Sequence, residues 1–238
     1  MPPNNSLQLT RLACGKLECA LPARMRENGW TVARAAGQLS SRPLGGRSSE
    51  TEVRVRMVRG EDAVHIYQSL SANGITTWLT GGWGIDALLG TETRPHKDLD
   101  ILILVDDVTS MRQLLARAGY TLKELWSENA WALDSRGAEV PTALVLRDLD
   151  GREVDAHALR FDSSGNGIPA WANDEGWVFT RADLSGEGTI GDTAVRCLSP
   201  AMQLRCHSGY SLPESQVHDL SRLREKFRIQ PGVQRQST

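Results

Sequence analysis

Two aspartates in this sequence have the types and spacing best suited to chemistry. Asp98 and Asp100 begin the run DLDILILV, which predicts a central strand over Asp98–Val105. Alternate residues of a strand share a face, so the two carboxylates leave the same side with Cα atoms roughly 7 Å apart. Like charges this close repel unless a cation lies between them, and Mg²⁺ takes oxygen ligands that it shares with phosphates. The pair indicates a Mg²⁺ site; the alternative is a strand that begins with two exposed acids.

Residues upstream of this pair are suited to binding phosphate. Gly81 and Gly82 lie between a predicted strand and a predicted helix. Glycines there let backbone N–H groups approach a phosphate, and the start of a helix adds a favourable dipole. Between the glycines and the acids stand three cationic side chains, Arg94, His96 and Lys97, which could pair with a triphosphate or a leaving pyrophosphate. No P-loop or G-x-G-x-x-G pattern accompanies the glycines.

A third carboxylate, Asp155, lies on another predicted strand, Glu153–Leu159, and could reach the same site. His157 alternates with it and is either its orienting partner or an ordinary core histidine. Asp86 is expected to cap the short helix or to pair with Arg94. Several tryptophans either line an acceptor pocket or pack in the core: Trp126, Trp131, Trp171 and Trp177.

Periodicity and turn signals predict the elements that must position these residues. The predicted strands are Thr76–Thr80, Asp98–Val105, Tyr120–Leu125, Ala130–Asp134, Thr142–Leu146, Glu153–Leu159 and Ala194–Leu198. The predicted helices are Gly60–Asn73, Trp83–Leu89, Val108–Ala118, Pro200–Ser208 and Pro213–Phe227, and Phe161–Gly176 is expected to be a loop. Strands outnumber helices and are mostly adjacent, which favours an α+β fold: a mixed sheet flanked by helices, with short C-terminal helices.

The chain of 238 residues is long enough for one ordinary domain and a smaller appendage. Residues 1–50 scatter Arg, Ser, Gly and Pro without periodicity, so we expect a disordered N-terminal extension there. A basic arm or a transit-like peptide is the alternative. We expect the folded domain to span residues 57–228 and residues 229–238 to form a disordered tail.

Composition narrows the classes of partner. A net charge of −2 gives no bulk attraction to nucleic acid or to an anionic membrane, so we expect neither as a partner. No apolar run is long enough for a transmembrane helix, and no secretory signal is recognisable. The cysteines lack the paired spacing of a zinc site: Cys14, Cys19, Cys197 and Cys206. A cytoplasmic protein with reduced thiols is expected, and the oligomeric state is left open.

The order Gly-Gly, short helix, Asp-x-Asp and later Asp resembles the nucleotidyltransferase superfamily with the DNA polymerase β-like fold. Within it, WLTGGWGID at 78–86 and RPHKDLD at 94–100 are similar to the lincosamide and related aminoglycoside nucleotidyltransferases. A second block, His207–Leu212 followed by HDL at 218–220, also resembles the lincosamide enzymes, with no chemical role assigned. The resemblance spans about Met57–Phe227. Many superfamily members have Gly-Ser where this chain has Gly82-Trp83.

The resemblance implies an enzyme that uses Mg²⁺ and a nucleoside triphosphate, ATP for preference. It would transfer AMP to a hydroxyl group of a small molecule, a lincosamide or an aminoglycoside antibiotic. Asp98 and Asp100 would hold Mg²⁺, Gly81 and Gly82 would contact the triphosphate, and Asp155 would act as metal ligand, base or both.

Other functions stay open at this point. One is a toxin-like nucleotidyltransferase that acts on RNA or protein, and another is a catalytically silent nucleotide-binding module. Between the two antibiotic classes, carboxylates in Asp162–Asp183 suit a polycationic aminoglycoside. The His207–Leu212 block favours a lincosamide instead.

Overall fold

A computed structural model of the protein describes residues 56–172, 176–208 and 211–230. The extension expected at 1–50 and most of the tail expected at 229–238 lie outside these ranges, as do Cys14 and Cys19. Within the described residues, none of the helices has the length and apolar character needed to cross a bilayer.

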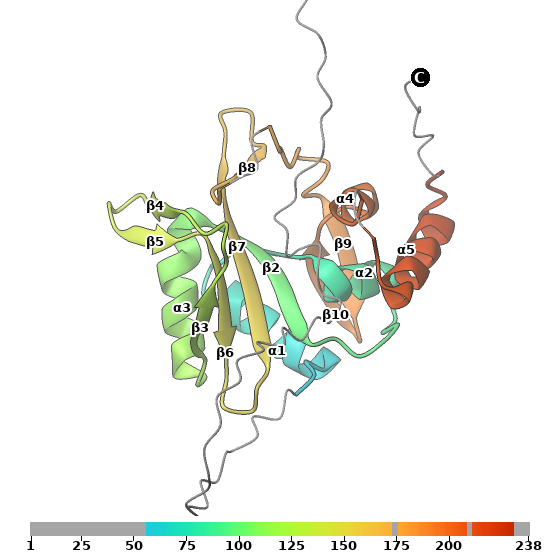
Figure 1. Ribbon diagram of the computed structural model, residues 1–238, viewed down its shortest axis with the longest axis horizontal. Helices are drawn as coiled ribbons and strands as arrows, with labels where there is room; N and C mark the ends of the chain where they lie inside the picture. The colour runs from blue at the N-terminus through green and yellow to red at the C-terminus, as the bar shows by residue number, and fades with distance from the viewer. Residues whose placement is uncertain (1–55, 173–175, 209–210, 231–238) are drawn as a thin grey trace, which may run out of the picture.

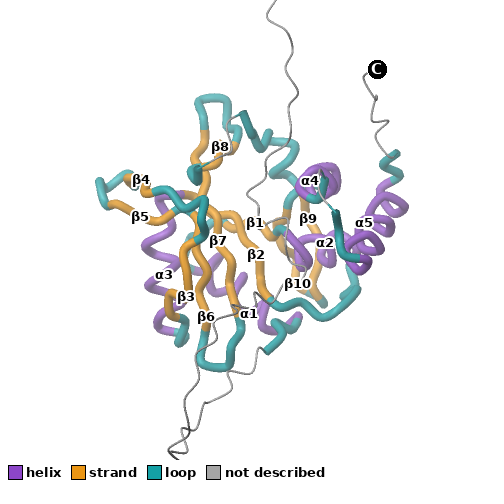
Figure 2. The backbone as a smooth tube through the Cα atoms, viewed as in Figure 1, coloured by secondary structure: helices purple, strands orange, loops and turns teal. Residues whose placement is uncertain are grey.

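The centre of the fold is an eight-stranded mixed sheet, which confirms the predicted fold class. Its strand order is β3-β6-β7-β2-β1-β10-β9, with β8 added to β7. The strands are β1 (Thr77–Leu79), β2 (Asp98–Leu104), β3 (Thr121–Leu125), β6 (Ala143–Arg147), β7 (Glu153–Phe161), β8 (Gly167–Pro169), β9 (Gly186–Ile190) and β10 (Thr193–Cys197). Strand β2 runs parallel to β7, and β1 runs parallel to β10. A separate hairpin of β4 (Trp131–Leu133) and β5 (Glu139–Pro141) projects from the sheet (Figure 2).

The helices fall into two groups (Figure 1). Helices α1 (Gly60–Ala72) and α3 (Val108–Arg117) lie behind the strands, whereas three others gather beside β9 and β10: α2 (Gly81–Leu89), α4 (Pro200–Cys206) and α5 (Glu214–Phe227). Ser199 caps α4 by accepting a hydrogen bond from the backbone N–H of Met202, and Pro200 occupies the first helical position. Both features follow from the Ser-Pro sequence.

The central strands give the sheet two unlike faces. On one face the residues of β2 and β7 join the main hydrophobic core with α1 and α3; they are Leu99, Ile101, Ile103, Val154, Ala156 and Ala158. The alternate residues face the other side and are mostly charged at the beginning of these strands. Further along, that second face becomes apolar and is covered by a smaller core: Trp78, Leu102, Ala143, Leu159, Trp171, Trp177, Phe179, Leu198, Met202 and Cys206.

Three strands are not predicted from the sequence: β5, β8 and β9. Strand β9 reads GEGTI, and glycine weakens a strand. Gly188 is nevertheless needed there, because a Cβ at this position would overlap the backbone of Ala87 in α2. Close packing of a helix on this strand therefore overrides its low β propensity. The segment expected to be a loop, Phe161–Gly176, contains β8, which pairs with the end of β7.

Candidate active site

The pairing of β2 with β7 brings the three predicted aspartates to one place. Asp100 is the register partner of Asp155, and Asp98 is the partner of Glu153. Partners in neighbouring strands face the same side about 4.8 Å apart, so all three aspartates share one face of the sheet. Sequence spacing predicts the first two on one face, and the parallel register adds the third.

Asp98 and Asp100 lie in an environment that disfavours their negative charge. Burial, then the charges of Asp155 and other neighbours, raises the pKa of Asp98 to about 6. Burial and the charges of Asp98 and Asp155 raise the pKa of Asp100 well above its ordinary value. Both side chains keep part of their surface open to solvent, so a cation has access to them. A bound cation would relieve this repulsion, which fits the chemistry of a Mg²⁺ site.

The protein does not enclose a metal ion by itself. Among the residues that the structure describes, no group of three or more His, Cys, Asp and Glu side chains is placed so that it could hold a metal ion. Mg²⁺ commonly keeps water and takes further oxygens from substrate phosphates. The carboxylates therefore fit a partial ligand set that a nucleotide would complete.

Asp155 is held on one of its two oxygens. The indole Nε1 of Trp126 donates a hydrogen bond to Asp155 Oδ1 at 2.8 Å. His157 Nδ1 lies 3.3 Å from the same oxygen. His157 is therefore a partner of Asp155, the first of the two alternatives that the sequence leaves open. The indole contact is not predictable from the sequence, because Trp126 is brought there by the pairing of β3, β6 and β7.

His157 lies buried between two carboxylates. Its Nε2 is 3.5 Å from Glu128 Oε1, an ion-pair separation without the alignment of a good hydrogen bond. Burial alone would lower the pKa of His157, but Asp155 and Glu128 outweigh burial and raise that pKa to about 9. The imidazole is therefore charged at neutral pH. Glu128, which accepts a hydrogen bond from Ser127, is a residue of this network that sequence reasoning missed.

The side of β2 and β7 that carries Asp98, Asp100 and Asp155 is called the acidic face. The Gly81-Gly82 pair lies directly against it, at the start of α2. Gly81 has φ +58°, and a Cβ there would overlap the carboxylate of Asp100. A Cβ on Gly82 would overlap the imidazole of His96. A side chain at Gly81 would fill the space between the helix start and the Asp100 carboxylate, and one at Gly82 would displace His96. Backbone N–H groups at this end of α2 are thus close to the place where a metal-bound phosphate would lie.

His96 makes its contacts inside the protein. It is 2 % exposed, and its Nε2 lies 2.5 Å from Asp86 Oδ2. Asp86 also accepts hydrogen bonds from the N–H and hydroxyl of Thr93. The alternative in which Asp86 pairs with Arg94 is wrong, because Asp86 is already engaged by His96 and Thr93. Helix α2 and the following loop are therefore joined through a buried polar pair.

The other two predicted cations also have carboxylate partners. Arg94 Nε donates to Asp219 Oδ2 at 2.9 Å, and Asp219 is 2 % exposed. Lys97 Nζ lies 3.2 Å from Glu153 Oε2. Glu153 is buried and also binds Lys123 and Arg147 through Oε1, so three cations surround one carboxylate beside Asp98.

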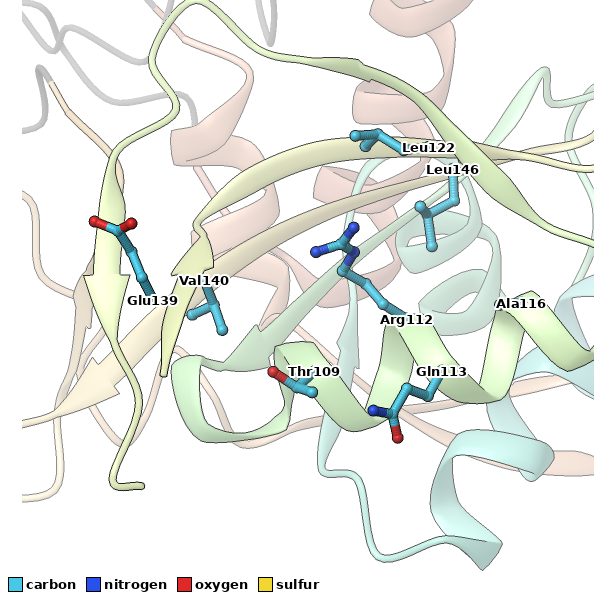
Figure 3. Close-up of a pocket in the computed structure, with 8 residues that line it drawn as sticks. All are labelled: Thr109, Arg112, Gln113, Ala116, Leu122, Glu139, Val140 and Leu146. Atoms are coloured by element: carbon cyan, nitrogen blue, oxygen red, sulfur yellow. The ribbon is translucent and has the colours of Figure 1, made fainter. Parts of the chain in front are cut away.

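A cavity of about 340 Å³ lies elsewhere in the described residues (Figure 3). Residues of α3, β3, β5 and β6 line it: Thr109, Arg112, Gln113, Ala116, Leu122, Glu139, Val140 and Leu146. Leu146 alternates with Val145, the register partner of Asp155, so this cavity is on the opposite face of the sheet. This cavity is therefore separate from the face that carries Asp98, Asp100 and Asp155.

Comparisons with known proteins identify the family of the chain. Residues 62–223, more than half of the chain, match the family described as aminoglycoside-2''-adenylyltransferase. A lincosamide resistance protein of Staphylococcus haemolyticus is 29% identical over 150 residues, which make up 63% of this chain and 84% of that relative.

Two solved structures have the same fold. The lincomycin-bound lincosamide adenylyltransferase LnuA aligns with a TM-score of 0.58 and 27% identity, over 71% of this chain and 98% of the other. The antibiotic-resistance factor ANT(2'')-Ia aligns with a TM-score of 0.50 and 16% identity, over 69% and 82% of the two chains. The chain therefore belongs to the aminoglycoside-2''-adenylyltransferase family and is a nucleotidyltransferase.

Proposed function

We propose that the protein transfers AMP from ATP to a hydroxyl group of a lincosamide antibiotic and that it requires Mg²⁺. One observation carries the reaction type: the register of β2 and β7 places Asp98, Asp100 and Asp155 on one face, beside the Gly81-Gly82 start of α2. Carboxylates that share a cation, next to a helix start that accepts phosphate, are the parts needed for transfer of a nucleotidyl group.

The protein contributes positioning and charge to this reaction. Asp98, Asp100 and Asp155 would hold Mg²⁺, which when bound neutralises the charge of the attacking and leaving oxygens. Backbone N–H groups at Gly81 and Gly82 bind the triphosphate. Trp126 and His157 both contact Oδ1 of Asp155, which leaves Oδ2 to accept the proton of the acceptor hydroxyl.

Arg94, Lys97 and His96 contribute to nucleotide binding in different ways. Arg94 is bonded to Asp219 through Nε only, so its remaining nitrogens can meet the phosphates. Lys97 is about half exposed and joins the cluster around Glu153, from which it can meet an outer phosphate. His96 is buried against Asp86, so it acts on the nucleotide by shaping the helix start beside Gly82.

The choice of a lincosamide acceptor rests on charge and on the relatives. The segment Asp162–Asp183 contains four carboxylates: Asp162, Asp174, Glu175 and Asp183. Asp162 and Asp183 bond to residues of their own loops, Asn166 and Thr180, so they are occupied in turns, whereas Asp174 and Glu175 lie outside the described residues. The three cations around Glu153 border the acidic face and oppose a polycationic acceptor. The relatives with 29% and 27% identity are named for lincosamides, whereas ANT(2'')-Ia is 16% identical.

An aminoglycoside is the second candidate acceptor. The family description favours it, because the matching family is that of aminoglycoside-2''-adenylyltransferases.

We further propose that the protein works in the cytoplasm, where nucleoside triphosphates are available. The buried free thiols of Cys197 and Cys206 agree with a reducing compartment.

Mass spectrometry of single antibiotics separates the two acceptors. The protein is incubated with ATP, Mg²⁺ and either lincomycin or tobramycin, and the antibiotic mass is measured over time. We expect lincomycin to gain one AMP unit and tobramycin to stay unchanged. Modification of tobramycin alone would replace the lincosamide proposal by the aminoglycoside one, and the absence of an adduct on either would contradict both.

The role of Asp155 needs a separate experiment. If Asp155 is the base, Asp155→Asn should still bind ATP and Mg²⁺, while turnover falls and added Mg²⁺ restores little of it. If Asp155 only binds metal, high Mg²⁺ should restore most of the rate. Full rescue by Mg²⁺ would rule out the base role, and unchanged turnover would remove Asp155 from the site.

A further inference from the structure

The C-terminal helix α5 has no part in the reaction described so far, yet it contacts the nucleotide side of the site. Asp219 in the middle of α5 accepts a hydrogen bond from Arg94 Nε at 2.9 Å. The two residues are 125 positions apart in the sequence. The Asp219 side chain is 2 % exposed and that of Arg94 is 28 % exposed. A buried carboxylate therefore holds a partly open guanidinium.

This geometry determines which edge of Arg94 is available. Nε is used by Asp219, and Nη1 makes only a long contact of 3.4 Å with the carbonyl of Pro95. A guanidinium has five N–H donors in a planar fork, so a bond at Nε leaves donors at the terminal nitrogens. Such a fork is suited to phosphate oxygens.

Arg94 lies within electrostatic reach of the acidic face. Its positive charge is one of the influences that lower the pKa of Asp100, against the larger upward effects of burial and the neighbouring aspartates. It also acts on His207, which belongs to the second sequence block and bonds to the carbonyl of Gln203 at 2.8 Å. Arg94 thus bonds to α5 through Asp219 and also acts electrostatically on Asp100, one of the carboxylates that would hold Mg²⁺.

A second contact shows that α5 is fixed to the helix that begins the phosphate site. Lys226 Nζ donates to the carbonyls of Leu88 and Leu89, both at 2.9 Å, at the C-terminal end of α2. Unpaired carbonyls at a helix end are favourable partners for a cation. Because the other end of α2 carries Gly81 and Gly82, α5 supports this helix at its far end through Lys226 and the following loop through Asp219.

We propose that Asp219 is a positioning residue for nucleotide binding: it holds Arg94 so that the terminal nitrogens of the guanidinium meet the triphosphate. The inference rests on the proposed nucleotidyl transfer and gives the HDL block at 218–220 a role. An arginine held beforehand in its binding orientation loses less conformational entropy when the phosphate arrives. Asp219 acts through Arg94 and does not touch the nucleotide itself.

Binding of ATP in the absence of an antibiotic tests this inference. Isothermal titration calorimetry with ATP and Mg²⁺ is done on the full chain and on Asp219→Asn, Arg94→Gln and the double variant. We expect Kd to rise about fivefold to tenfold for Asp219→Asn and somewhat more for Arg94→Gln, because a charge-assisted contact is lost. The double variant should be no weaker than Arg94→Gln alone, since both changes remove the same contact.

Two further variants separate positioning from support of the fold. Lys226→Met removes the other bond between α5 and α2, so it should lower the melting temperature but leave the Kd of ATP within about twofold. Arg94→Lys keeps the charge but offers only one nitrogen, which Asp219 would occupy, so ATP binding should be as weak as in Arg94→Gln.

The inference is overturned if Asp219→Asn binds ATP like the unaltered chain while Arg94→Gln does not. It is also overturned if the effects of Asp219→Asn and Arg94→Gln on the free energy of ATP binding add up in the double variant. Normal ATP binding by Arg94→Lys would overturn it as well. The Arg94→Lys result can be interpreted even if Asp219→Asn does not fold. Failure of the lincosamide proposal would be recognised separately, because these titrations contain no acceptor.

Discussion

The two faces of strands β2 and β7 serve different purposes although their residues alternate along the same chain. On one face, Ile101 and Ala156 are completely buried among apolar neighbours. On the other, Asp100 and Asp155 are register partners, and the pKa of Asp100 is raised by burial and by its acidic neighbours. Burial of the apolar face stabilises the fold. The acidic face holds carboxylates whose mutual repulsion costs free energy until a cation binds between them.

The largest difference between the faces should appear in Asp100→Asn. We expect turnover to fall by about a thousandfold or more, because a metal ligand is lost. The melting temperature should stay equal or rise, since the substitution removes repulsion among Asp98, Asp100 and Asp155. Pyrophosphate release and thermal unfolding measure the two effects. A variant that loses activity only because it unfolds would contradict the comparison.

The neighbouring residue should behave in the opposite way. Ile101→Ala opens a cavity in the main core and should lower the free energy of unfolding by about 2–5 kcal/mol. The fraction that remains folded at low temperature should keep near-normal turnover, because Ile101 faces away from the carboxylates. Urea unfolding gives the free energy of unfolding, and an activity assay at about 10 °C gives the turnover. Loss of turnover in fully folded Ile101→Ala would show that the faces are not independent.

The third difference between the faces is the charge of His157. The protonated imidazole is favoured because Asp155 and Glu128 lie beside it. Its folded pKa of about 9 is above the ordinary 6.5, so His157 contributes stability that is complete below pH 6.5 and is lost as pH rises through 9. Between pH 6.5 and 9, the difference in unfolding free energy between the unaltered chain and His157→Gln should therefore shrink by up to about 3 kcal/mol. A pH-independent difference in unfolding free energy would mean that folding does not shift the pKa of His157.

The smallest effect is expected for the single hydrogen bond that orients Asp155. Trp126→Phe keeps an aromatic ring but removes the N–H that Asp155 Oδ1 accepts. We expect kcat to fall about threefold to tenfold with KM for ATP unchanged, the usual size for one hydrogen bond. Trp131→Phe is the matched control, since Trp131 is 58 % exposed on the β4–β5 hairpin. Equal effects of the two substitutions would remove Trp126 from the site.

Local sequence predicted the elements on which the site depends. The helices α1, α3, α4 and α5 and the central strand β2 lie where periodicity and caps place them, within a few residues. Asp98 and Asp100 share a face because of their spacing alone. The resemblance to nucleotidyltransferases, carried by the Gly-Gly and Asp-x-Asp runs, is confirmed by the family match.

Contacts between distant parts of the chain could not be predicted in this way. The register that pairs Asp100 with Asp155, and the bond from Arg94 to Asp219, both depend on how whole elements pack. A single sequence contains no signal for either. The charge of His96 predicts a phosphate partner, whereas its burial against Asp86 reflects the docking of the following loop on α2.

Removal and return of Mg²⁺ test whether the acidic face of β2 and β7 is a catalytic metal site. In a single-turnover experiment, AMP transfer from labelled ATP to lincomycin is followed after the protein has been treated with a chelator, and again after Mg²⁺ is added in excess. We expect transfer to stop with the chelator, to return with Mg²⁺, and to stay absent in Asp98→Asn and Asp100→Asn at any Mg²⁺ concentration. Transfer that continues in the chelator, or near-normal transfer by either variant, would contradict the claim that the acidic face of β2 and β7 is the catalytic metal site.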